Sequence, residues 1–139
     1  MPHHGRLKLV VDTNIWISYL LTGSFATLVN GWRTERFILL YSEDLLREIM
    51  DVLSRPHLRK RIPVGVAEAL VNSIRHNASA VEVTSVVDAC RDAKDNYLLS
   101  LAMDGHADIL VTGDDDLQVL HSFAQAIILS PAEFTAAFK

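Results

Sequence analysis

Leu7-Lys8-Leu9-Val10-Val11-Asp12-Thr13-Asn14 is the stretch from which the fold of this chain can be derived. Residues 7–11 are apolar apart from one lysine, which is typical of a strand buried on both faces of a sheet. Residues 15–21 are then apolar at helical spacing, and the chain turns at residues 22–24, Thr-Gly-Ser. A buried strand followed directly by a helix indicates an α/β fold.

The same alternation of strand and helix continues along the chain. Further strands are predicted for residues 37–41, 81–84, 109–111 and 126–129. Further helices are predicted for residues 25–32, 42–54, 63–76, 92–104, 117–123 and from 130 onward. Ser42 is expected to cap its helix, Gly105 to close another as a left-handed C-cap, and Ser130-Pro131-Ala132-Glu133 to form a capping box. This order predicts a three-layer α/β/α sandwich with a central, mainly parallel, Rossmann-like sheet, in one domain spanning residues 1–139.

The composition indicates a protein of the cytosol. Half of the 139 residues are hydrophobic, so one core can be filled, but no apolar run approaches the roughly 20 residues of a membrane helix. The N-terminal residues lack the pattern of a signal peptide. The single cysteine, Cys90, excludes an internal disulfide and a cysteine-rich zinc site.

The net charge of −4 argues weakly against nucleic acid as a partner, because phosphate binding depends on Lys and Arg. A total charge can conceal a local cluster of acids around a cation and basic residues elsewhere. One basic run exists, formed by Arg55, Arg59, Lys60 and Arg61. It is either a surface for RNA or a solvated loop after a helix.

Two predicted buried strands end in acids, Asp12 after the first and Asp114 after the fourth. Ligands of open α/β sheets bind beyond the carboxyl ends of the strands, so these acids are candidate site residues. Either acid could instead cap the helix that follows it. Residues 112–116, Thr-Gly-Asp-Asp-Asp, are less easily explained by capping, because three adjacent acids repel one another unless a cation or basic groups lie nearby.

Two helices carry further candidate acids. Asp92 and Asp95 have the spacing of a helix cap and its partner, but Asp95 shares a face with apolar residues and should point toward the protein body. Glu48 borders the apolar stripe of its helix. Asp44 and Asp51 lie near the same flank, so periodicity alone does not select Glu48.

Carboxylates without a His or Cys cluster favour Mg²⁺ or Mn²⁺ over zinc. The chemistry they suggest is hydrolysis of a phosphodiester by water that a metal ion activates.

The sequence resembles the PIN-domain family, and more closely its VapC-like branch of toxins from toxin–antitoxin pairs. The resembling segments cover nearly the whole chain, and their order and spacing are specific where each alone is weak. They are residues 10–14, 42–48, Arg55-Pro56 with the basic run after it, 92–96 and 107–117.

The resemblance implies a role for each of these positions. Asp12, Glu48, Asp95 and Asp114 match the acidic quartet that binds Mg²⁺ or Mn²⁺ for endonucleolytic cleavage of RNA. Asp116 and Asp92 match auxiliary acids, and Asn14 and Thr112 match polar positions that support the first acid or the bound water. It further implies an antitoxin protein as partner and a homodimer, for which Trp16 and Trp32 could supply apolar surface if they are not simply core residues.

Two other functions compete with this hypothesis. A non-catalytic PIN scaffold would bind RNA or a protein without cutting. An aspartyl-phosphate domain also places acids at strand ends, but the phosphatase type needs a second Asp where Asn14 stands. The receiver type needs paired early acids and a late lysine, and neither is evident.

Overall fold

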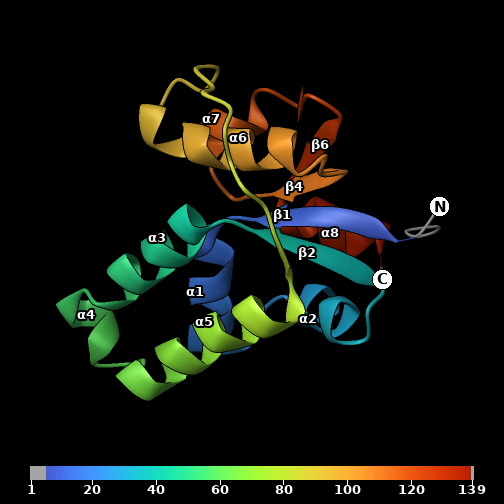
Figure 1. Ribbon diagram of the computed structural model, residues 1–139. Helices are drawn as coiled ribbons and strands as arrows, with labels where there is room; N and C mark the ends of the chain where they lie inside the picture. Colours follow the sequence, from blue (N-terminus) through green and yellow to red (C-terminus); the bar gives the residue numbers. More distant parts are fainter. Residues whose placement is uncertain (1–5, 139) are drawn as a thin grey trace.

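The computed structural model describes residues 6–138, in which a six-stranded sheet lies between helices (Figure 1). The strands are β1 (Leu7–Val11), β2 (Phe37–Tyr41), β3 (Ser79–Ala80), β4 (Ile109–Val111), β5 (Ser122–Phe123) and β6 (Ala126–Leu129). The helices are α1 (Thr13–Thr22), α2 (Ala26–Arg33), α3 (Glu43–Leu53), α4 (Pro56–Arg59), α5 (Val64–Asn77), the 3₁₀ turn η1 (Ala93–Asp95), α6 (Asn96–Asp104), α7 (Asp115–Gln118) and α8 (Pro131–Ala137).

The strand order is β3-β2-β1-β4-β6-β5, and every pairing is parallel except that between β5 and β6. Figure 1 shows α6 on one side of the strands and α1 and α2 on the other. The predicted α/β sandwich with a mainly parallel sheet is therefore confirmed. The chain leaves β1 toward β2 but returns to β4 on the other side of β1, so the strand order reverses between β1 and β4. Such a switch point is where open α/β sheets bind ligands.

The central strands form the core and hold the edge of the sheet in register. Val10, Val11 and Leu110 are fully buried, as expected for strands covered on both faces. Val11 lies opposite Val111, and the Asp12 amide donates to the Val111 carbonyl at 3.0 Å. The residues that follow β1 and β4 therefore begin at the same level of the sheet.

The two tryptophans belong to this core. Trp16 and Trp32 are 1% and 5% exposed, and their rings pack edge to face with centroids 5.5 Å apart. They stabilise the packing of α1 against α2 and supply no apolar surface to a second subunit. No helix within the described residues has the length and hydrophobicity that crossing a bilayer demands. The prediction about the N-terminal leader falls on residues 1–5, outside the described range.

The strand predicted at residues 81–84 is wrong. The structure has β3 two residues earlier, where Ser79 and Ala80 pair with the end of β2. The Val81 amide still donates to the Tyr41 carbonyl, but β2 ends there and the chain turns into α3. The following residues have no strand to pair with, and residues 81–92 form no regular element.

Gly105 does not adopt the predicted left-handed C-cap, since its φ is −85°. The left-handed residue is the next one, His106, with φ 52°. A Cβ on Gly105 would lie 2.7 Å from the Leu40 side chain, so the glycine allows the end of α6 to approach β2 closely. The sequence signal was correct about the helix end and wrong about its conformation.

The helix predicted for residues 117–123 is also wrong in its extent. α7 lies two residues earlier and has only four residues, after which Ser122 and Phe123 form β5. His121, with a φ of 62°, separates α7 from β5, and Ala124, with a φ of 53°, lies in the turn that lets β5 pair antiparallel with β6. Pairing with the edge of the sheet overrides the short apolar pattern that suggested a longer helix.

Candidate active site

Asp12 follows β1, and its carboxylate is buried at the switch point between β1 and β4. The side chain is 7% exposed and makes no capping hydrogen bond with α1, although the residue occupies the N-cap position. Instead, the Thr112 hydroxyl donates to Asp12 Oδ2 at 2.7 Å. Burial raises the pKa of Asp12, the Thr112 hydroxyl opposes this shift, and the charges of Asp114 and Glu48 add to it. Helix capping therefore does not explain Asp12.

Thr112 ties the ends of β1 and β4 together. It is fully buried, and its hydroxyl oxygen also accepts a hydrogen bond from the Asp114 amide at 3.0 Å. One hydroxyl thus orients Asp12 and fixes the backbone that carries Asp114. Thr112 therefore positions both acids, and its supporting role in the chemistry stays a prediction.

Asp114 and Asp95 form a pair of carboxyl groups. Asp114 uses Oδ1 to cap α7, accepting from the Asp116 amide at 2.8 Å, so the capping alternative holds for that oxygen. Its carboxyl group also lies close enough to Asp95 to act on it electrostatically. Burial, followed by the neighbouring Asp114 carboxyl group, raises the pKa of Asp95 to about 7.

Glu48 approaches from α3 and contributes charge near Asp12. Its side chain is half-buried, whereas Asp44 is exposed and forms an ion pair with Arg47. Asp51 is exposed as well. The rotation of α3 therefore turns Glu48, and neither of its two neighbours, toward the buried acid.

The auxiliary positions Asp92, Asp116 and Asn14 differ in their contacts. Asp92 caps the η1 turn by accepting from the Lys94 amide at 3.1 Å, which is the structural role that its spacing suggested. Asp116 is half-buried, and Arg91 Nε lies 3.3 Å from its Oδ1. Asn14 is exposed at the start of α1, and within the described residues no hydrogen bond joins its side chain to Asp12.

The basic run lies around α4. All four cations are exposed, and none of them lines the cavity that includes Glu48: Arg55, Arg59, Lys60 and Arg61. In Figure 1, α4 lies at the left, in the connection between α3 and α5. The structure therefore places the run beyond α3, away from direct contact with the acidic cluster.

The donor set fits a hard divalent cation in its chemistry. All the converging side chains offer carboxylate oxygens, and burial together with the charges of neighbouring acids raises the pKa of Asp12 and Asp95. Within residues 6–138, however, no three His, Cys, Asp or Glu side chains are arranged as a ready-made metal site. The acids lie near one another without forming a preorganised coordination site, so their side chains would have to move closer together when a cation binds.

Sequence reasoning missed two residues next to these acids. Asn96 is buried, and its Oδ1 accepts from the amides of Ala89 and Cys90 at 3.2 and 2.9 Å. Tyr97 is half-buried, with its hydroxyl 3.3 Å from the Thr13 hydroxyl. Both belong to the segment that includes Asp95, but neither is acidic, so a search for charged ligands passed over them.

Two polar side chains, Asp104 and Asn96, hold the 81–92 segment in place. The Asp104 carboxylate accepts from the amides of Thr84 and Ser85 and from the Ser85 hydroxyl, and these bonds lower its pKa. Asn96 holds the other end of the segment. Figure 1 shows the segment crossing between α5 and α6 without regular structure, so these polar contacts fix the approach to η1.

Replacing Asn96 by Ala is expected to destabilise the protein by about 2 kcal/mol, because two partly buried amides lose their acceptor. Urea unfolding without added metal measures the change. Asn72→Ala, at an exposed position on α5, is the control and should have little effect. Equal unfolding midpoints for the two variants would contradict the anchoring role of Asn96.

Comparison with known proteins gives a consistent result. The sequence model of the PIN domain matches residues 8–116. A chain in the crystal structure of VapBC2 from Rickettsia felis, bound to a DNA fragment from their promoter, is 12% identical with a TM-score of 0.57, covering 89% of this chain and 98% of that chain. PAE2754 from Pyrobaculum aerophilum is 14% identical with a TM-score of 0.56, covering 96% of this chain and 92% of that chain. At such identities the similarity concerns the fold. No curated protein matches the sequence.

Proposed function

The chain belongs to the PIN-domain family, and we propose that it is a metal-dependent endoribonuclease that hydrolyses phosphodiester bonds of RNA. The observation that carries the proposal is the environment of Asp12. This carboxylate is buried, caps no helix, and faces the acids Asp114 and Glu48. A cluster of this kind is costly for the fold, and a function that uses its charge accounts for it.

Asp12, Glu48, Asp95 and Asp114 would hold Mg²⁺ or Mn²⁺, with Asp116 as an auxiliary ligand. The cation, when bound, supplies Lewis-acid polarisation of the phosphodiester and activation of water. Thr112 keeps the Asp12 carboxylate oriented through its 2.7 Å hydrogen bond.

Two further residues have supporting roles in the proposal. Asp92 stabilises the turn that carries Asp95. Asn14, at the exposed start of α1, is available to a bound water or phosphate.

The exposed basic run at α4 would attract RNA by long-range electrostatics; its cations are Arg55, Arg59, Lys60 and Arg61. Such attraction is screened by salt, with a Debye length of about 8 Å at physiological ionic strength. Close contacts to the scissile region must then come from other side chains.

The VapC-like resemblance of the sequence motifs extends the proposal to partners. The protein would be the toxin of a cytoplasmic toxin–antitoxin pair, would be inhibited by an antitoxin protein, and would form a homodimer. The likeness to a VapBC2 chain adds support for the fold of such a toxin.

Cleavage of a labelled, mixed-sequence RNA by purified protein tests the catalytic proposal. Cleavage is expected with Mg²⁺ or Mn²⁺, and EDTA should lower the rate by at least about 10³-fold, which corresponds to about 4 kcal/mol. RNA binding that is insensitive to metal, with no cleavage under any condition, would favour the non-catalytic scaffold instead.

A further inference from the structure

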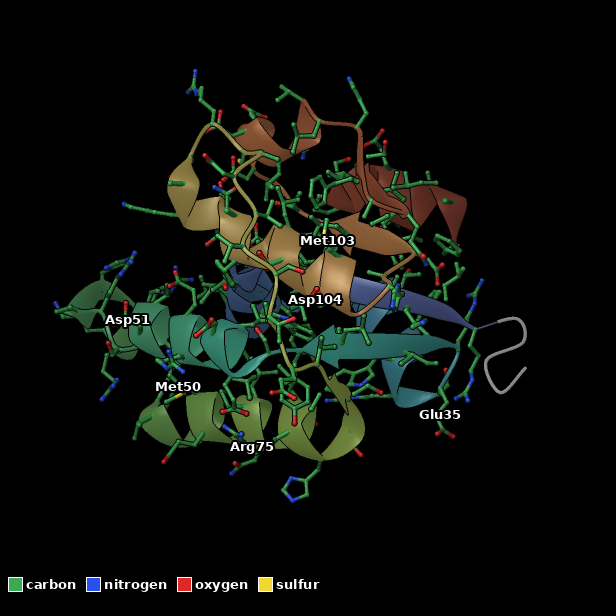
Figure 2. All side chains as sticks on the ribbon, turned by 45° about the horizontal axis from the view of Figure 1, so that its top comes forward. Glu35, Met50, Asp51, Arg75, Met103 and Asp104 are labelled. Atoms are coloured by element: carbon green, nitrogen blue, oxygen red, sulfur yellow. The ribbon has the colours of Figure 1, made fainter. Side chains whose placement is uncertain are left out.

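A groove of about 500 Å³ opens beside the acidic cluster, between α3 and the η1–α6 segment. In Figure 2, the labelled Asp51 marks the α3 wall, and α6 lies across from it. The lining residues are Asp44, Arg47, Glu48, Asp51, Lys94 and Tyr97. Glu48 belongs both to this lining and to the acidic cluster, so the groove leads directly into the candidate active site.

Tyr97 provides a hydrogen-bond donor where the groove meets the acids. Its hydroxyl lies 3.3 Å from that of Thr13, the residue after Asp12, and the acids Asp12 and Glu48 are near enough to act on it electrostatically. Ionised carboxylates can only accept hydrogen bonds, and the oxygens of a phosphodiester are acceptors as well. A neutral O–H group in this place can therefore bind a phosphate that the surrounding acids cannot.

Two cations line opposite walls of the same groove, Arg47 on α3 and Lys94 on η1. Arg47 is paired with Asp44 at 2.9 Å, but the two side chains are 73% and 59% exposed. Such an exposed pair contributes little free energy, so Arg47 can exchange Asp44 for another anion. Within the described residues, Lys94 takes part in no salt bridge. Both cations are thus available to an anionic ligand.

We propose that this groove holds the RNA strand next to the scissile bond. Arg47 and Lys94 contact backbone phosphates, and the Tyr97 hydroxyl donates to the phosphate that enters the acidic site. Asp44 and Asp51 oppose the anion and keep the affinity moderate. The inference rests on the proposed ribonuclease function, and it assigns close RNA contacts to residues outside the basic run at α4.

Steady-state cleavage kinetics of four variants test the groove. Tyr97→Phe should lower kcat/KM by about 10- to 100-fold, because it removes one hydrogen bond to a charged group and keeps the ring. Arg47→Gln should raise KM, whereas Asp44→Asn should lower KM by releasing Arg47. Opposite effects from two exposed residues on the same helical turn are not expected from a structural role. Arg33→Gln, an exposed cation on α2, is the control and should leave both constants unchanged.

Binding of the same RNA in EDTA, followed by fluorescence anisotropy, separates the possible failures. A wild-type protein that binds RNA without cutting contradicts the nuclease proposal, and the order of affinities Asp44→Asn, wild type, Arg47→Gln still tests the groove. If the wild type cuts RNA but all three groove variants keep its kcat, KM and affinity, the groove inference is wrong and the nuclease proposal stands. Should Tyr97→Phe melt early, the two surface variants decide the outcome.

Discussion

Asp12→Asn is expected to lower metal-dependent RNA cleavage by about 10³-fold, equivalent to about 4 kcal/mol of transition-state stabilisation. Asn has nearly the same shape as Asp, and its side-chain oxygen can still accept from the Thr112 hydroxyl. The variant removes only the negative charge and one anionic ligand. Cleavage of labelled RNA at saturating Mn²⁺ measures the effect.

The melting temperature of Asp12→Asn distinguishes a loss of catalysis from a loss of folding. The buried Asp12 carboxylate is disfavoured by desolvation and by the nearby charges of Asp114 and Glu48. Its neutralisation should therefore leave the melting temperature of the metal-free protein unchanged or slightly higher. Asp115→Asn, at an exposed acid beside Asp114, is the matched control and should retain activity. Full activity of Asp12→Asn, or equal losses in both variants, would contradict the assignment.

Much of the fold could be predicted because β1, β2, β4 and β6 are apolar runs, with Lys8 as the one charged residue among them. β1, β2, β4 and β6 have the predicted bounds, since each mostly apolar run is flanked by polar residues that mark its ends. Ser42 and the capping box at Ser130 are also confirmed, because a cap is a local interaction within one helical turn.

The errors occurred where backbone pairing and side-chain contacts outside the segment determine its structure. Residues 81–84 alternate like a strand, but the neighbouring strand ends at Tyr41, and Asp104 holds the backbone instead. β5 forms because β6 offers an open edge, which the local sequence does not reveal. Hydrophobic periodicity reports only the side chains of one segment, whereas the structure of both segments depends on which backbone groups are available for pairing.

The candidate site could be predicted only in part for the same reason. Strand ends brought Asp12 and Asp114 together, since parallel strands share one carboxyl edge. Helical periodicity could not select Glu48 over Asp44, because it did not resolve the rotation of α3 about its axis. The family resemblance made that selection. Tyr97 was missed because its importance lies in its distance from Thr13, and no spacing along the chain encodes that contact.

Asp95→Asn should abolish most of the metal-dependent activity and yet stabilise the metal-free protein at pH 8. The pKa of Asp95 is raised to about 7 by burial and by Asp114, well above the usual 3.8. The folded protein therefore binds this proton more tightly than the unfolded chain does. The stabilisation of the folded state by this Asp95 proton is fully present below about pH 4. It is lost as the pH rises toward 7, where the folded protein must separate two charged carboxylates.

Asn at this position does not titrate, so the unfolding free energy of the variant should change less between pH 5 and pH 8. Because Asp95 is partly exposed, we expect a gain of about 1–2 kcal/mol at pH 8, reduced for solvent screening. Urea unfolding in EDTA at both pH values measures it, with Asp88→Asn, an exposed acid in the 81–92 segment, as control. Added Mg²⁺ should stabilise the wild type at pH 8 and have little effect on Asp95→Asn. If the variant is instead less stable than the wild type at pH 8, the Asp95–Asp114 pair contributes to folding, and the inference that this acidic cluster is maintained for metal binding fails.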